Sequence, residues 1–217
     1  MLTKDLSNHL ALVTGATGGI GSATCRALAS LGCSLAVHYH TDSATAASLV
    51  ADLRSTHHVR AEPFQADLSH YDDVRQLHQN VLQKLGPPTI LFNNAGLTAG
   101  KSGVTDIADV SVEVFEDTWR ANCGSAFLLT QLCVPHMERV GWGRVLFCSS
   151  VAAFTGGLVG PHYAQHYGPK GVTVNGVAPA LIRDTKMLPG NPEALAQKIP
   201  IGVLGTPEEI AETVLWM

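Results

Sequence analysis

The sequence predicts an α/β fold: a doubly wound parallel sheet in a three-layer αβα arrangement, formed as a single domain over residues 1–217. Its 217 residues suit one domain with a sizeable core. Apolar residues make up 46% and charged residues 15%, which is a globular composition. Short apolar runs also alternate along the chain with helical segments, the order typical of a parallel sheet covered by helices.

The stretch Leu10–Gly21, LALVTGATGGIG, is the centre of this prediction. Its first four residues form an apolar run that suits one buried strand. Thr14 and Gly15 then turn the chain, and residues 23–29 read as a helix. Between turn and helix stand Gly18, Gly19 and Gly21. Clustered glycines before a helix present bare N–H groups at its positive end, where the diphosphate of a dinucleotide is the usual ligand.

The remaining elements follow from apolar runs and turn signals. Strands are expected at 34–39, 59–66, 89–92, 143–148 and 171–175, and helices at 43–55, 70–85, 111–140 and from Thr206 onward. Pro63 favours an edge position for the third strand. Thr206, Pro207 and Glu209 are typical of a capped helix start. The stretch from Pro189 to Pro200 is expected to be a flexible lid over a substrate.

Composition excludes several functions. A net charge of −4 gives no electrostatic reason to bind nucleic acid or an anionic membrane. The ten histidines are scattered without metal-ligand spacing, and no 18-residue apolar run suggests a membrane span. The five cysteines include no CxxC pair, which suits a reducing compartment. With no targeting segment at the N-terminus, a cytoplasmic protein without a metal is expected.

The end of the second strand bears on cofactor choice. An acidic residue there would bind the adenine-ribose hydroxyls and select NAD. Here the positions are Tyr39, His40 and Thr41, so NADP(H) is favoured and NAD(H) stays possible. His38 and His40 either meet a 2′-phosphate or are exposed residues at the strand end.

Three motifs resemble the short-chain dehydrogenase/reductase family, in the expected order and over nearly the whole chain. They are the TGxxxGxG loop that begins at Thr14, the Asn93–Gly96 turn (NNAG), and Asn122, Ser150 and Tyr163 at the family's separations. The resemblance implies a Rossmann-type fold and an oxidoreductase that moves a hydride between NAD(P) and a ketone or secondary alcohol. The 3-oxoacyl-[acyl-carrier-protein] reductases are the nearest members.

The resemblance also assigns roles. Tyr163 would donate a proton to the carbonyl oxygen, Ser150 would stabilise that oxygen, and Asn122 would hold a water at a helix irregularity. The alternative for Asn122 is an amide that bonds a neighbouring loop. Asp67 would contact the adenine amino group, and either it or Ser69 would cap the following helix. The implied cofactor-binding residues are Gly15, Thr17, Gly18, Gly19, Ile20, Gly21, His40, Asp67, Leu68, Asn94, Ala95, Gly96, Tyr163, Pro179, Ile182 and Thr185.

The chain departs from the family pattern after Tyr163. Tyr167 stands where the family has a lysine, and Gly168-Pro169 breaks any helix before Lys170, so that a rescue by Lys170 is not expected. The helix after Tyr163 is therefore expected to be short and the last strand absent. Since that helix forms half of a family subunit interface, the dimer or tetramer of the family is not expected. The alternative function is a catalytically defective isoform that at most binds nucleotide.

Overall fold

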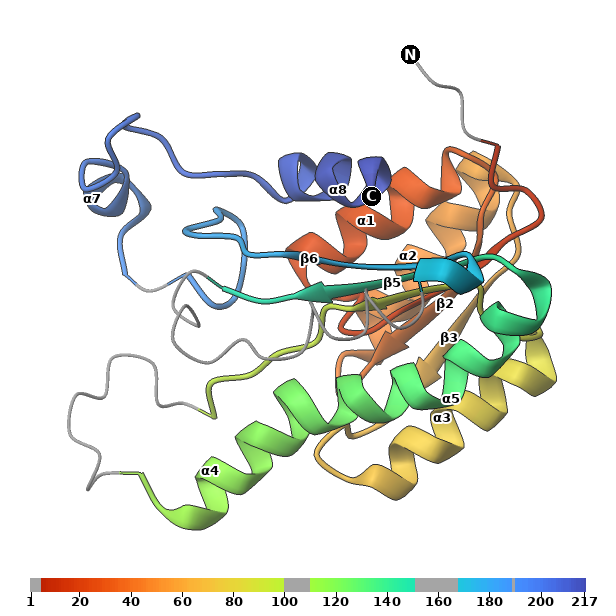
Figure 1. The fold of residues 1–217 in the computed structure, drawn as a ribbon. Helices are drawn as coiled ribbons and strands as arrows, with labels where there is room; N and C mark the ends of the chain where they lie inside the picture. Colours follow the sequence, from red (N-terminus) through yellow and green to blue (C-terminus); the bar gives the residue numbers. More distant parts are fainter. Residues whose placement is uncertain (1–4, 100–109, 151–167, 189) are drawn as a thin grey trace.

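The structure is a computed structural model that describes residues 5–99, 110–150, 168–188 and 190–217. Within these residues a six-stranded parallel sheet has the order β3-β2-β1-β4-β5-β6 (Figure 1). The strands are β1 (Leu10–Val13), β2 (Ser34–Tyr39), β3 (Ala61–Gln65), β4 (Ile90–Asn93), β5 (Gly143–Cys148) and β6 (Val172–Val177). The order reverses direction between β1 and β4, which makes this a doubly wound sheet and confirms the predicted fold class.

Helices cover both faces of the sheet (Figure 1). On one face α1 packs against both α2 and α8, and on the other α3 packs against α5. The α-helices are α1 (Gly19–Ala29), α2 (Ser43–His57), α3 (Tyr71–Lys84), α4 (Val112–Trp119), α5 (Ser125–Val140), α7 (Pro192–Ala196) and α8 (Pro207–Trp216). A π-helical turn, η2 (Arg120–Gly124), joins α4 to α5, and a 3₁₀ turn, η4 (Gly168–Lys170), precedes β6.

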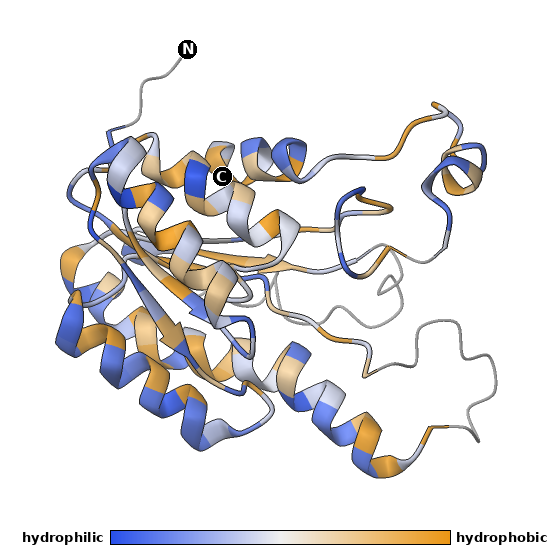
Figure 2. Ribbon diagram, turned by 180° about the vertical axis from the view of Figure 1, so that it is seen from behind, coloured by the Kyte–Doolittle hydropathy of each residue, from blue (hydrophilic) through white to orange (hydrophobic). Residues whose placement is uncertain are grey.

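The core lies in two layers because strand residues alternate between the faces of the sheet. In β1, Leu10 and Leu12 join the cluster beneath α3 and α5, whereas Ala11 and Val13 join the cluster beneath α1 and α2. In Figure 2 the helices carry both hydrophobic and hydrophilic residues, as expected of segments with one face on the sheet.

Several elements match the sequence prediction. Strands β2 and β5 have the predicted bounds, and β3, with Pro63, is an edge strand. Thr206 accepts a hydrogen bond from the Glu209 backbone while the Glu209 side chain accepts one from the Thr206 backbone, which confirms the capped start of α8. The cysteines are all free, and three of them are buried.

Two helices differ from the prediction. Helix α1 begins at Gly19 rather than at residue 23, so two of the loop glycines belong to its first turn. The single helix expected over 111–140 is three segments, because η2 interrupts it. Phe115 and Trp119 lie one helical turn apart, but nothing covers this apolar pair, since α4 has no buried residue and both residues are more than half exposed.

Candidate functional site

The loops after β1 and β4 are hydrogen-bonded to each other. The hydroxyl of Thr14 accepts hydrogen bonds from the backbone N–H groups of Asn94 at 2.9 Å and of Ala95 at 3.0 Å. In return the Asn94 amide donates to the carbonyls of Thr14 at 2.9 Å and of Gly15 at 3.2 Å. The Asn94 side chain therefore bonds the backbone of the neighbouring loop across the sheet. These bonds fix the glycine loop against the NNAG turn.

Gly15 and Gly21 make this close approach possible. Gly15 has a φ of +61°, and a β-carbon there would lie 2.9 Å from the Ala95 α-carbon. A β-carbon on Gly21 would collide with the carbonyl oxygen of Gly15. No side chain caps α1, so the first-turn amides of the helix remain as donors at its positive end. Local geometry thus fits a phosphate at this place.

A cleft of about 460 Å³ runs over the carboxyl ends of the strands. Every predicted cofactor-binding residue within the described part of the chain lines this cleft. These are Gly15, Thr17, Gly18, Gly19, Ile20, Gly21, His40, Asp67, Leu68, Asn94, Ala95, Gly96, Pro179, Ile182 and Thr185. The cleft is therefore continuous from the end of β2 and β3, past the glycine loop, to the loop after β6.

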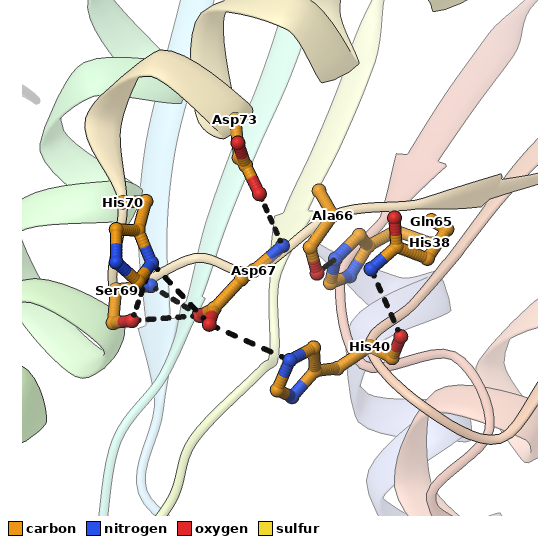
Figure 3. Close-up of polar contacts among 8 residues, drawn as sticks. All are labelled: His38, His40, Gln65, Ala66, Asp67, Ser69, His70 and Asp73. Carbon is orange, nitrogen blue, oxygen red and sulfur yellow. Dashed lines mark hydrogen bonds and ion pairs between the residues drawn. The ribbon is translucent and has the colours of Figure 1, made fainter.

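At one end of the cleft Asp67 collects several partners (Figure 3). Its carboxylate accepts hydrogen bonds from the Ser69 backbone at 2.9 Å and hydroxyl at 2.7 Å, and it lies 3.5 Å from His40 Nε2 and 3.3 Å from His70 Nδ1. Burial acts to raise the pKa of Asp67, but the Ser69 hydrogen bonds and the two histidines outweigh it and lower the pKa. The expected helix cap is wrong, since the N-cap residue of α3 is His70, without a side-chain bond.

The end of β2 offers no free carboxylate. Asp42 accepts a hydrogen bond from the Thr45 backbone at 3.1 Å, as the N-cap of α2, and lies 3.6 Å from Lys186 Nζ. Both expectations for His38 are wrong. It is buried, and its ring bonds the backbone of Gly15 and Ala66 instead of facing a phosphate or solvent. Both histidines line the cleft, but His40 has a half-exposed side chain.

The predicted catalytic residues are placed in part. Ser150, directly after β5, lines the cleft and is exposed. Tyr163 lies outside the described residues, as does Tyr167. Asn122 lies in η2, which confirms the helix irregularity expected there. Its amide also makes the loop contact that was the alternative: Oδ1 accepts from the Leu97 N–H and Nδ2 donates to the Leu97 carbonyl, both at 2.8 Å.

Lys170 is placed far from this cleft. It lies in the turn before β6 and forms an ion pair with Glu138, near the end of α5. Both positions belong to the amino ends of β5 and β6, whereas Ser150 follows the carboxyl end of β5. Lys170 therefore does not approach Ser150, whereas its distance from Tyr163 lies outside the described residues.

Sequence reasoning missed five residues of the loop after β6, which are Ala180, Leu181 and the three that directly follow Thr185. Lys186, Met187 and Leu188 line the cleft beside Thr185. Lys186 is the one lysine or arginine among the lining residues in the described ranges. Their adjacency to Thr185 was the available signal, but it does not show which way the loop turns. The same described residues contain no group of three His, Cys, Asp or Glu side chains that could hold a metal ion, and no helix in them is long and apolar enough to cross a membrane.

A doubly wound parallel sheet with a glycine-lined cleft at the carboxyl ends of its strands defines a nucleotide-binding protein of the Rossmann type. The chain matches the short chain dehydrogenase family over residues 9–195, and it belongs to that family.

Two curated relatives extend over almost the whole chain. An uncharacterised oxidoreductase of Bacillus subtilis, YmfI, is 33% identical and covers 97% of this chain and 91% of its own length. The 3-oxoacyl-[acyl-carrier-protein] reductase FabG of Aquifex aeolicus is 31% identical and covers 98% of this chain and 90% of its own length.

Solved structures agree with the fold. A blue fluorescent protein from a metagenomic library, in complex with NADPH, has a TM-score of 0.87 at 29% identity, over 98% of this chain and 91% of that one. A short chain dehydrogenase from Burkholderia cenocepacia in complex with NADP has a TM-score of 0.84 at 27% identity, with the same shares covered.

Proposed function

We propose that this chain binds NADPH in the cleft and uses it to reduce a ketone to a secondary alcohol. The observation that carries the proposal is that one cleft collects the glycine loop, the NNAG turn, Ser150 and the loop after β6. Two structural neighbours bind NADPH or NADP, and one relative is a 3-oxoacyl-[acyl-carrier-protein] reductase. A 3-oxoacyl thioester is therefore the substrate class to test first.

Each part of the cleft has a proposed task. The amides of the glycine loop and of the first turn of α1 hold the diphosphate. His40 faces the adenine ribose, where no carboxylate is free to select NAD. Bound there, NADPH supplies the hydride. Ser150 holds the carbonyl oxygen of the substrate, and Tyr163 donates the proton. The free cysteines support a reducing compartment, and we infer the cytoplasm.

The test is the oxidation of NADPH in the presence of a 3-oxoacyl thioester. We expect turnover that Ser150→Ala lowers by about 10²-fold, the usual cost of one donor to a developing oxyanion, and that Tyr163→Phe abolishes. Because free tyrosine has a pKa of about 10 and no lysine stands four residues after Tyr163, the rate should rise toward alkaline pH. Equal rates in both variants and the native chain would contradict these roles.

A second candidate function is nucleotide binding without turnover. The ion pair of Lys170 with Glu138 favours it, since this lysine is held away from Ser150. Saturable NADPH binding with no NADPH oxidation at any pH would identify this function.

The oligomeric state is tested by sedimentation. Since the family interface needs the helix after Tyr163, we expect no tight tetramer, and a tight tetramer would contradict this inference.

A further inference from the structure

The imidazole of His38 is a buried titratable group to which the proposed chemistry assigns no task. Only 2% of the residue is exposed. Nδ1 lies 3.0 Å from the backbone nitrogen of Gly15, and Nε2 lies 3.2 Å from the carbonyl oxygen of Ala66, a contact drawn in Figure 3. The backbone carbonyl of His38 also accepts a hydrogen bond from Ala16 at 2.8 Å. One residue of β2 therefore holds the first two amides of the turn after Thr14.

These partners determine the protonation state of the ring. The Gly15 N–H is a donor, so Nδ1 must be an unprotonated acceptor. The Ala66 carbonyl is an acceptor, so Nε2 must carry the hydrogen. A neutral imidazole with its hydrogen on Nε2 satisfies both partners. An imidazolium would direct an N–H at the Gly15 N–H and would lose that hydrogen bond.

We propose that His38 is a positioning residue for the dinucleotide: its neutral ring fixes the Gly15 backbone, and thereby the glycine loop whose amides hold the diphosphate. The identity of the ligand, a dinucleotide, rests on the proposed function. Gly15 is bonded from both sides, since its N–H donates to His38 on β2 and its carbonyl accepts from Asn94 after β4. Without the His38 ring, the Gly15 N–H would lose its acceptor, and Gly15 itself would keep only the hydrogen bonds that its carbonyl accepts from Asn94 and from Gly18.

The surroundings keep the ring neutral. Burial lowers the pKa of His38 to about 4, against the opposing effect of the Ala66 hydrogen bond. Just past the end of β2 the neighbouring titratable group is His40, Asp67 and His70 follow β3, and Asp73 lies in the first turn of α3 (Figure 3). The glycine loop over residues 14–21 and the turn over 93–96 carry no titratable side chain. A fixed acceptor thus faces Gly15 across the ordinary pH range.

Two variants distinguish the roles of the two ring nitrogens of His38. In His38→Asn the amide oxygen takes the place of Nδ1 and can accept the Gly15 N–H. In His38→Gln the longer side chain reaches the place of Nε2 and can donate to Ala66, but leaves Gly15 without its acceptor. Both substitutions lose packing, so melting temperatures measured without ligand serve as the control for stability.

The readout is the dissociation constant of NADPH, measured at pH 7.5 by fluorescence titration. We expect His38→Gln to bind about tenfold more weakly than the native chain, the size of one lost hydrogen bond, and His38→Asn to regain most of that loss. As the pH is lowered toward 4, affinity should fall more steeply in the native chain than in His38→Asn, since the two proteins differ only in the side chain at position 38. Gln and Asn variants of equal affinity would overturn the proposal.

A second readout needs no nucleotide. Nitrogen-15 NMR of the ring in the ligand-free chain should report a neutral His38 with its hydrogen on Nε2 at pH 7.5. A cationic ring, or a hydrogen on Nδ1, would overturn the inference whatever the chain binds. If the ring is neutral as expected but the native chain binds no NADPH, the proposed function is wrong. The role of His38 in dinucleotide binding is then wrong as well, because there is no such ligand to position. If the chain binds NADPH and the variants do not differ, the inference alone fails.

Discussion

Gly15 is held in a conformation that combines a left-handed backbone with close packing. Gly141, the C-cap of α5, has nearly the same φ, +65° against +61°, but a β-carbon there would meet nothing within 4 Å. We expect Gly141→Ala to cost about 1 kcal/mol of unfolding free energy from the backbone alone. Gly15→Ala should cost more, because its β-carbon would press on Ala95, and should abolish NADPH binding. Urea unfolding and ligand titration check this pair, and equal effects would contradict it.

His38 also predicts how stability depends on pH. Its pKa of about 4 in the folded chain lies below the ordinary histidine value of about 6.5. Between these values the unfolded chain binds a proton that the folded chain does not. The contribution of the neutral His38 ring to the free energy of unfolding is therefore fully present above pH 6.5. As the pH falls toward 4, it decreases by up to about 3 kcal/mol. Urea unfolding at pH 7.5 and 4.5 should show a shallower decline in His38→Asn, and an unchanged decline would refute this.

His40, which lines the cleft just past the end of β2, is the residue that should set cofactor preference. In the variant His40→Asp a carboxylate would repel the 2′-phosphate of NADPH and could accept the ribose hydroxyls of NADH. We expect NADPH to bind at least about tenfold more weakly and NADH to bind more tightly, with the ratio of dissociation constants as the measurement. Thr41→Asp at the adjacent position serves as a comparison. A His40→Asp variant that keeps the native ratio would exclude this role.

Sequence alone could predict the residues whose role follows from their type and their place in a motif. Gly15 had to be glycine for the turn, and Asn94 had to bond backbone to satisfy its amide. His38 could not be predicted in this way. Strand alternation shows which face a side chain takes, but the partners of a buried ring depend on two other loops, those of Gly15 and Ala66, meeting above it.

Among the elements, the π-helical turn η2 shapes the second side of the cleft. Gly124 ends this turn, and a β-carbon there would collide with the phenol oxygen of Tyr71 at the start of α3. The turn also carries Asn122, which holds the backbone of Leu97 beside the NNAG turn. Close packing of α3 on η2 therefore contributes to the geometry of the loop over the cleft.

A double-mutant cycle tests that packing. Gly124→Ala should destabilise the chain by at most about 1 kcal/mol, because the new β-carbon meets only the far end of the partly exposed Tyr71 ring, which can rotate away. In a Tyr71→Ala background the same substitution should become neutral or stabilising, because alanine has the higher helix propensity once the clash is gone. Urea unfolding of the four proteins gives the coupling free energy. A cost of Gly124→Ala that is the same in both backgrounds would contradict the account.

Element types were predictable from apolar periodicity, whereas irregular junctions were not. The strands over 34–39 and 143–148 have the bounds that their apolar runs predicted. The start of α1 at Gly19 was missed because glycine has low helix propensity, and tertiary packing on α8 outweighs it. The exposure of Phe115 and Trp119 could not be predicted, because periodicity identifies an apolar face but not whether anything covers it.

At the scale of the whole molecule, topology brings the site together. The sheet order places the ends of β1 and β4 side by side at the switch point, and loops from both sides of it form one cleft. This much followed from the alternation of strands and helices. The placement of Lys186 over the cleft did not, because it depends on how the loop after β6 packs on the glycine loop, where a β-carbon on Gly19 would lie 2.7 Å from the Asp184 carbonyl oxygen.

The central claim is that this cleft binds a nicotinamide dinucleotide. A fluorescence titration of the purified chain with NADPH, and with NADH alongside, tests it most directly. We predict saturable binding of both nucleotides, with the tighter constant for NADPH, and loss of binding in Gly15→Ala but not in Gly141→Ala. No saturable binding of either nucleotide to a folded chain would contradict the account.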